Sequence, residues 1–217
     1  MSRPLRVEFP GAFYHVFARG NDKREIFNHE VDYRGFLTLV GEAAERWDLA
    51  LHAYALMPNH YHLLLEAKGG FLSQPMKYVN GLHGQAFNHR HGRVGHLLQG
   101  RFKAILVDQD RYLLTLSRYI HQNPVKAGLV DSPEKYRWSS CRAFAGLVEP
   151  PAWLSIGMTL SRFGSTLESQ HSNYIAFLGI QEEPDPSRFA VRQIVLGSED
   201  FLKKVQGRVR PGVRPRV

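Results

Sequence analysis

The sequence predicts an α+β fold, a ferredoxin-like four-stranded antiparallel sheet with helices packed against it. Strand and helix patterns over residues 12–107 follow the order strand, helix, strand, strand, helix, strand, which is a split βαβ unit. Only three turn residues separate the two middle strands, too few for a crossover, so these strands form a hairpin. The chain has 217 residues, of which 43% are hydrophobic, enough to bury a core without disulfides.

Local sequence patterns predict the elements in the first half of this unit. Residues 12–18 (AFYHVFA) are aromatic and β-branched and precede Gly20-Asn21, which indicates a strand and a turn. Apolar residues recur at helical spacing over 31–47 and predict an amphipathic helix. The stretches 49–57 and 61–66 are apolar and flank Pro58-Asn59-His60, so they are the hairpin strands.

The second half adds one helix beyond the split βαβ unit. Residues 72–89 favour a helix weakened by two glycines, and 102–107 (FKAILV) favour the fourth strand. A further helix is predicted over 109–122, with Asp108 as its N-cap and Asn123-Pro124 as its end. We expect this helix on the sheet face that the first two helices leave open.

A boundary near Pro150 is predicted where the patterns weaken. It divides the chain into a core of residues 1–149 and a mainly helical extension of residues 150–217. Helical spacing over 161–177 and 188–205 flanks a proline-rich acidic stretch, and the end of the chain is a basic tail.

The cysteine count and the lack of long apolar runs bear on location. Cys141 is the only cysteine, so an internal disulfide and a cysteine-rich zinc site are both excluded, and a reducing cytoplasmic setting is expected. Neither a signal-peptide run nor a membrane span is evident, so no membrane partner is expected.

Positive charge is concentrated in one segment. The chain carries 28 Lys and Arg against 20 Asp and Glu, a net charge of +8, which favours a polyanionic partner. No acidic residue occurs between Glu66 and Asp108, and aromatic residues alternate with cations there, as in a groove for single-stranded nucleic acid. The alternative is a solvated basic face. The candidate DNA-binding cations are Lys68, Lys77, Arg90, Arg93, Arg101 and Lys103.

Two short patterns suggest chemistry. His60 and His62 alternate on a strand, so both imidazoles project from one face and could share a cation; solvated histidines are the alternative. On the helix 109–122, Tyr112, Tyr119 and Asn123 follow one flank, and Tyr119 and Asn123 are one turn apart. They offer a phenol nucleophile and a third ligand, unless Tyr119 is an ordinary boundary tyrosine.

Several motifs in order carry a resemblance to a known family. These are LMPNHYHLLL, YLLTLSRYIHQNPVKAG and YRWSS, within a stretch from about Phe13 to Ser140. The sequence resembles the HUH single-tyrosine transposases, and among them the branch called REP-associated tyrosine transposases.

The resemblance implies an enzyme that nicks and rejoins single-stranded or hairpin DNA through a 5′-phosphotyrosine intermediate. It implies that His60, His62 and Asn123 bind a divalent cation, Mg²⁺ or Mn²⁺, and that Tyr119 is the nucleophile. Tyr112 is then assigned to packing or strand positioning. Two imidazole ligands should accept manganese at least as well as magnesium. The sequence leaves open whether the chain is a monomer or a dimer that exchanges the tyrosine helix.

Two other functions fit part of the pattern. A non-catalytic single-stranded nucleic-acid binding module would use the same basic and aromatic residues, but it does not require the pairing of Tyr119 with Asn123. A metal-dependent hydrolase would use the histidines and a water molecule, but the sequence lacks an evident carboxylate cluster for such a site.

Overall fold

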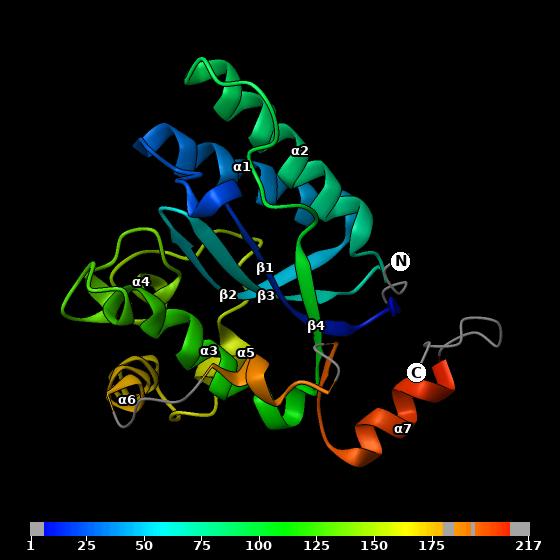
Figure 1. The fold of residues 1–217 in the computed structure, drawn as a ribbon. Helices are drawn as coiled ribbons and strands as arrows, with labels where there is room; N and C mark the ends of the chain where they lie inside the picture. Colours follow the sequence, from blue (N-terminus) through cyan, green and yellow to red (C-terminus); the bar gives the residue numbers. More distant parts are fainter. Residues whose placement is uncertain (1–6, 180–184, 192–193, 209–217) are drawn as a thin grey trace.

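The predicted order of elements is confirmed in a computed structural model that describes residues 7–179, 185–191 and 194–208 (Figure 1). The bounds of these elements lie close to the predicted ones, except that the added helix continues past Pro124 to Lys126. In chain order they are β1 (Ala12–Arg19), a 3-10 turn η1 (Asn21–Lys23), α1 (Glu30–Trp47), β2 (Leu49–Met57), β3 (His60–Ala67), α2 (Ser73–Arg90), β4 (Lys103–Val107) and α3 (Gln109–Lys126).

The sheet has five strands in the order β2-β3-β1-β4-β5, so the prediction of four strands was incomplete. The first four strands are antiparallel to their neighbours, in agreement with the split βαβ arrangement. The fifth strand, β5 (Val195–Leu196), runs parallel to β4 and has only two residues. Two residues are too few to show the alternating pattern of a strand in the sequence. Pairing with the edge of β4 determines the conformation of β5.

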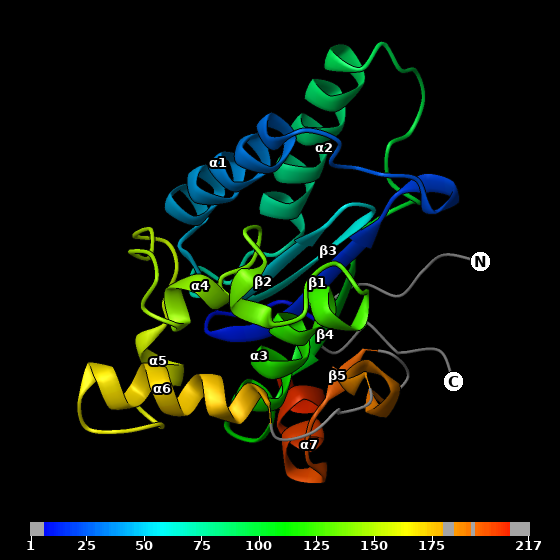
Figure 2. The same ribbon diagram turned by 90° about the vertical axis from the view of Figure 1, so that its left-hand side faces the viewer.

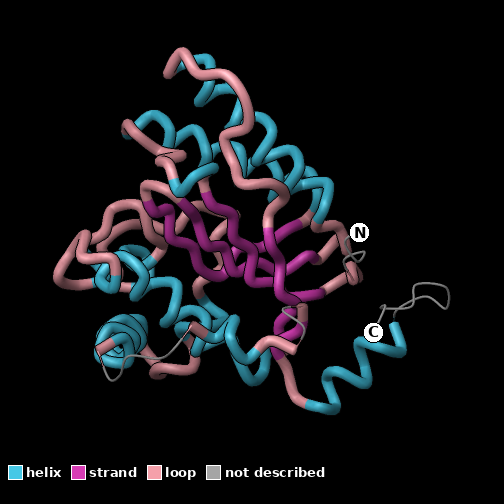
Figure 3. The backbone as a smooth tube through the Cα atoms, viewed as in Figure 1, coloured by secondary structure: helices cyan, strands magenta, loops and turns pink. Residues whose placement is uncertain are grey.

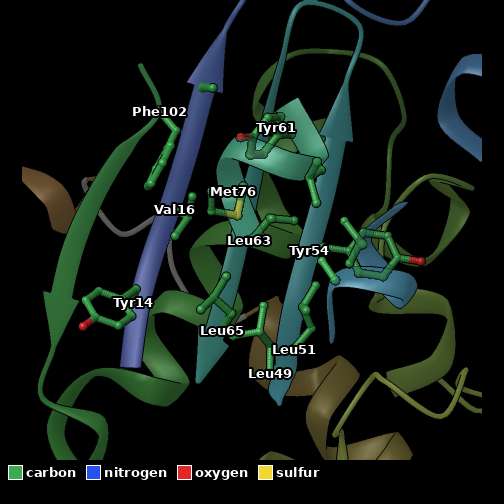
Figure 4. Packing of buried hydrophobic residues seen from close by; sticks show 14 of the residues in the cluster. Tyr14, Val16, Leu49, Leu51, Tyr54, Tyr61, Leu63, Leu65, Met76 and Phe102 are labelled. Carbon is green, nitrogen blue, oxygen red and sulfur yellow. The ribbon is translucent and has the colours of Figure 1, made fainter. Parts of the chain in front are cut away.

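Helices cover both faces of the sheet. Figure 2 shows α1 and α2 on one face and α3 on the other, and in Figure 3 the strands form the layer between them. Every residue of β2 is buried, as expected of a strand covered on both sides. Figure 4 shows the core on the α1 and α2 side, where Val16 and Leu63 of the sheet approach Met76 of α2.

The packing of α3 determines where the candidate nucleophile lies. Leu113, Leu116 and Ile120 of this helix are buried against a sheet face that includes Ala53 and Ala55 of β2. Alanines at these two positions leave room for the helix close to the sheet, since they have no side chain beyond Cβ. The other flank of the helix faces β1 and β3, and Tyr119 lies there.

The chain after α3 is partly helical and partly extended. It contains a 3-10 turn η2 (Pro133–Lys135), α4 (Cys141–Phe144), α5 (Gly157–Leu160), α6 (Leu167–Leu178), a 3-10 turn η3 (Pro186–Phe189), β5 and α7 (Glu199–Arg208). The predicted helix over 161–177 begins only at Leu167, where Thr166 provides a capping box. The helix predicted over 188–205 was wrong in its first half, which holds part of η3 and β5. The end of the basic tail lies outside the described residues.

Residues beyond Pro150 contribute to the main core. Leu154 pairs with Leu51 of β2, and Val195 and Val205 belong to the same hydrophobic cluster as Val16. The predicted division of the chain at this point stays a prediction. Within the described ranges, none of the helices combines the length and the apolar character that crossing a bilayer requires.

Candidate active site

The two histidines of β3 project from the sheet face that α3 covers. Their ring centroids are 5.1 Å apart, and the rings are almost perpendicular. Nδ1 of His60 lies 2.6 Å from Oδ1 of Asn59, and Nδ1 of His62 lies 2.9 Å from Nε2 of His15. Among the described residues, neither Nε2 atom has a hydrogen-bond partner. One nitrogen of each ring is therefore occupied and the other is left for a ligand.

Both imidazoles are neutral at neutral pH. Burial lowers the pKa of His60 to about 4, and the positive charge of Arg19 acts in the same direction. Burial, followed by the neighbouring His15 and His60, lowers the pKa of His62 well below its usual value. A neutral imidazole keeps a lone pair, so no proton has to leave before a cation binds.

Tyr119 and Asn123 approach the histidines from α3. The ring of Tyr119 is buried and meets the ring of His62 edge-on, with 5.6 Å between their centroids. Asn123 donates from Nδ2 to the backbone carbonyl of Tyr119 over 2.8 Å, and its side chain also lowers the pKa of the Tyr119 hydroxyl. The predicted neighbours on one helix turn are thus in contact, beside the histidine pair.

A carboxylate that the sequence did not reveal completes this cluster. Asp185, just before η3, is close enough to act on the Tyr119 hydroxyl. Burial raises the pKa of Tyr119 and the charge of Asp185 raises it further, while Asn123 and Arg188 act weakly in the opposite direction. Tyr119 is consequently a neutral phenol at neutral pH. The proline-rich segment around Asp185 carries no signal for this long-range contact.

The donor set fits a hard or borderline divalent cation. Two imidazole nitrogens and an amide oxygen suit Mn²⁺, and also Mg²⁺ when water completes the coordination. Within the described part of the chain, no three His, Cys, Asp or Glu side chains gather as a metal site, and Asn123 offers an amide oxygen as a candidate third ligand.

The family model for IS200-like transposases matches residues 9–123, more than half of the chain. This chain belongs to the IS200-like transposase family. The match ends at Asn123 and therefore includes both histidines and Tyr119.

Comparison with solved structures supports the same fold. The transposase resembles a REP-associated tyrosine transposase solved with a REP hairpin, at a TM-score of 0.57 and 17% identity over 71% of this chain and 92% of that one. A putative transposase from Deinococcus radiodurans R1 is 18% identical at a TM-score of 0.37, over 54% of this chain and 92% of the other. The Saccharomyces cerevisiae tRNA(His) guanylyltransferase is 7% identical at a TM-score of 0.43, covering 94% and 96%. No curated protein matches the transposase.

The structure separates the six predicted DNA-binding cations. Lys103 of β4 lies at the site. It is opposite Phe17 of β1, and the ring of Phe17 stacks on His62. Its Nζ is 5.8 Å from the centre of the Phe17 ring. Arg90 forms an ion pair with the buried Asp32, and the guanidinium of Arg93 lies 5.7 Å from the ring of Phe87. Lys68, Lys77 and Arg101 are exposed.

Two further cations of the transposase lie at the site but outside the acid-free segment. Arg19 ends β1 opposite His60, and its charge acts on the His60 ring. Nζ of Lys126 is 5.7 Å from the centre of the Tyr119 ring. Charge clustering along the sequence missed both, because strand pairing brings in Arg19 and two turns of α3 bring in Lys126.

Tyr112 lies away from this cluster. It is partly buried against the apolar face between α3 and the sheet, and the guanidinium of Arg111 is 5.6 Å from its ring centre. Two helical turns separate it from Tyr119, roughly 10 Å along the axis. Its surroundings in the transposase are those of a packing residue.

Proposed function

We propose that this transposase nicks and rejoins single-stranded or hairpin DNA through a 5′-phosphotyrosine intermediate on Tyr119. His60, His62 and Asn123 would hold the divalent cation, Mn²⁺ or Mg²⁺. The observation that carries the proposal is the edge-on contact between Tyr119 and His62, in which a phenol lies beside an imidazole whose Nε2 is unpartnered among the described residues.

The chemistry is one transesterification and its reverse. Oη of Tyr119 forms a bond to phosphorus while the bond from phosphorus to the 3′-oxygen breaks, and that oxygen leaves as a 3′-hydroxyl after taking a proton. The phenol proton departs to Asp185 or to solvent. Attack by another 3′-hydroxyl reverses these steps and joins two strands. Bond energy is conserved, so no nucleoside triphosphate is needed.

The protein groups have separate tasks in this proposal. When bound, the divalent cation supplies a Lewis acid that polarises the scissile phosphate. Asn123 stabilises the phenolate, because its side chain lowers the pKa of the Tyr119 hydroxyl. Arg19, Lys103 and Lys126 supply positive charge where the phosphates would lie.

Hairpin DNA is the substrate that the charge and the fold support best. The REP-associated transposase of similar fold was solved with a REP hairpin, and this chain carries a net charge of +8. We assign the chain to the REP-associated branch as part of the same proposal. Basic side chains beside the exposed rim of the sheet suit a backbone with unstacked bases.

A covalent trapping experiment tests the proposal. A hairpin oligonucleotide labelled at its 3′ end is incubated with the protein and Mn²⁺, and the products are separated on a denaturing gel. We expect a labelled band at the size of the protein, lost with a chelator and lost in His60→Ala and His62→Ala. Tight binding of the hairpin with neither cleavage nor adduct in Mn²⁺ or Mg²⁺ would favour the non-catalytic binding module instead.

A further inference from the structure

A third histidine lies directly behind the proposed metal ligands. His15 of β1 is 1% exposed, and its ring stacks on His62 with 5.1 Å between centroids and 21° between planes. Phe17 and Tyr119 flank the same ring, at 5.1 and 5.9 Å. A phenylalanine would suit such an aromatic cage without burying polar nitrogens, which is costly unless they are hydrogen-bonded. The imidazole at this position calls for an explanation.

The hydrogen bond between the two rings restricts where their protons lie. A neutral imidazole has one N–H and one lone pair, so a single proton lies between Nε2 of His15 and Nδ1 of His62. When His62 donates from Nδ1, its Nε2 carries a lone pair. When His15 donates instead, the proton of His62 has to be on Nε2, where it blocks a cation.

We propose that His15 is a positioning residue that accepts a hydrogen bond from Nδ1 of His62 and thereby presents Nε2 of His62 to the divalent cation. This proposal rests on the proposed function. Outer groups of this kind commonly fix the tautomer and the ring orientation of metal-binding histidines. His60 has an equivalent partner in Asn59, whose Oδ1 can only accept.

The surroundings of His15 restrict what its ring can do. Burial lowers the pKa of His15 to about 4, while the charge of Asp185 acts in the opposite direction, so the ring is neutral at neutral pH and has one proton. If His15 accepts at Nε2, this proton is on Nδ1, which is buried and has no hydrogen-bond partner within the described residues. The bond to His62 is thus the one side-chain hydrogen bond of the His15 ring among these residues.

A pair of substitutions separates hydrogen bonding from packing. His15→Phe keeps an aromatic ring between Phe17 and Tyr119 but removes the acceptor, whereas His15→Gln places an amide oxygen near the position of Nε2. His83→Phe is the matched control, because His83 is also buried, on α2, and bonds the carbonyl of Ile26. Affinity for Mn²⁺ is measured on the full chain without DNA, by electron paramagnetic resonance of the free ion.

We expect His15→Phe to weaken Mn²⁺ binding by about 10- to 100-fold, the usual effect of losing an outer-shell partner. His15→Gln should recover most of that loss, and His83→Phe should bind Mn²⁺ like the wild type. A second measurement needs no variant: nitrogen-15 NMR of the metal-free wild type should show the proton of His62 on Nδ1.

Two results would overturn the role of His15. One is wild-type Mn²⁺ affinity in a folded His15→Phe protein, and the other is a wild-type His62 protonated on Nε2 before metal is added. His62→Ala distinguishes this failure from that of the proposed function. If His62→Ala also binds Mn²⁺ normally, the metal site itself is misassigned; if it loses binding, only the positioning role fails.

Discussion

Helix α3 carries two clusters of tyrosine and histidine on different sides, and they differ in how completely their polar atoms are paired. The site cluster consists of Tyr119 and Asn123 with His15, His60 and His62. The anchor cluster consists of Ser117 and His121 with Ser140 and Tyr174. Both contain buried imidazoles beside a buried phenol, so residue type and burial do not tell them apart.

In the anchor cluster each side chain is satisfied by its neighbours. The hydroxyl of Tyr174 lies 2.7 Å from Oγ of Ser117 and 2.6 Å from Nδ1 of His121. Nε2 of His121 lies 2.7 Å from Oγ of Ser140, which also accepts from the backbone N–H of Tyr54. Both ring nitrogens of His121 are used, so no ligand position remains.

In the site cluster some ring nitrogens have no hydrogen-bond partner among the described residues. Nε2 of His60 and of His62 has no partner among the described residues, and Nδ1 of His15 is buried and unpaired. Unpaired polar atoms in a buried cluster cost stability, and they persist where a ligand or a reaction uses them. The two clusters therefore differ in incomplete pairing and not in the presence of histidine.

The anchor cluster also links the C-terminal part of the chain to α3. It connects α3 to α6 through Tyr174 and to β2 through Ser140 and Tyr54. These bonds hold the helix against the sheet of its own chain, with Tyr119 beside His62.

The largest expected effect separates the tyrosines of the two clusters. Tyr119→Phe should abolish the covalent DNA adduct, because no nucleophile remains at the phosphate, while hairpin affinity stays unchanged. Tyr174→Phe, assayed well below its melting temperature, should retain the adduct, and so should Tyr112→Phe. Denaturing gels of labelled hairpin reactions measure all three variants. An adduct in folded Tyr119→Phe would remove the distinction between the clusters.

The free energy of unfolding should fall more in Tyr174→Phe than in Tyr119→Phe, the reverse of the order for the DNA adduct. Tyr174→Phe leaves Oγ of Ser117 and Nδ1 of His121 without the Tyr174 hydroxyl in a dry interior, which costs about 1–3 kcal/mol of unfolding free energy. For a chain of this size the melting temperature falls by roughly 2–4 °C per kcal/mol. Tyr119→Phe should change it much less, since Asn123 keeps its hydrogen bond to the backbone carbonyl of residue 119. Calorimetry of the metal-free proteins is the measurement, and equal losses in both variants would contradict the contrast.

A third buried histidine, His83 on the opposite sheet face, provides a pH test. Burial lowers its pKa to about 4, below the 6.5 of an unfolded chain. As pH falls through 6.5 the unfolded state takes up the proton first, so stability is lost on acidification. His83→Gln can still donate to the Ile26 carbonyl but cannot titrate. Between pH 7 and 5 we expect it to lose about 2 kcal/mol less than the wild type in urea unfolding with chelator. Equal losses would place His83 in contact with water.

The smallest expected effect is on DNA binding, and it contrasts two lysines that lie near opposite ends of β3. Lys103 lies near His62, whereas Lys68 follows the far end of the strand, roughly 20 Å from His62 at 3.3 Å per residue. Lys103→Ala should weaken hairpin binding a few-fold and reduce the salt slope by about 0.9, the value for one phosphate contact. Lys68→Ala should change both less. Fluorescence anisotropy at several salt concentrations would reveal the opposite ranking if DNA crosses the other end of the sheet.

Local sequence patterns were sufficient to align candidate site residues on one element but not to predict contacts between elements. His60 and His62 alternate on a strand and Tyr119 and Asn123 are one helix turn apart, so periodicity alone aligns each pair. His15 could not be recognised in AFYHVFA, because its meeting with His62 depends on the register of β1 against β3. Asp185 and β5 were missed for the same reason, since only tertiary packing brings them to Tyr119 and to β4.

Locating the covalent bond tests the central assignment most directly. Trypsin cleaves after Arg111, Arg118 and Lys126, so Tyr112 and Tyr119 fall in the separate peptides YLLTLSR and YIHQNPVK. The wild-type adduct formed with a hairpin and Mn²⁺ is trimmed with nuclease, digested and examined by tandem mass spectrometry. We predict a nucleotide attached to the tyrosine of YIHQNPVK and an unmodified YLLTLSR. A nucleotide on Tyr112 with Tyr119 unmodified would contradict the assignment of the reactive side of α3.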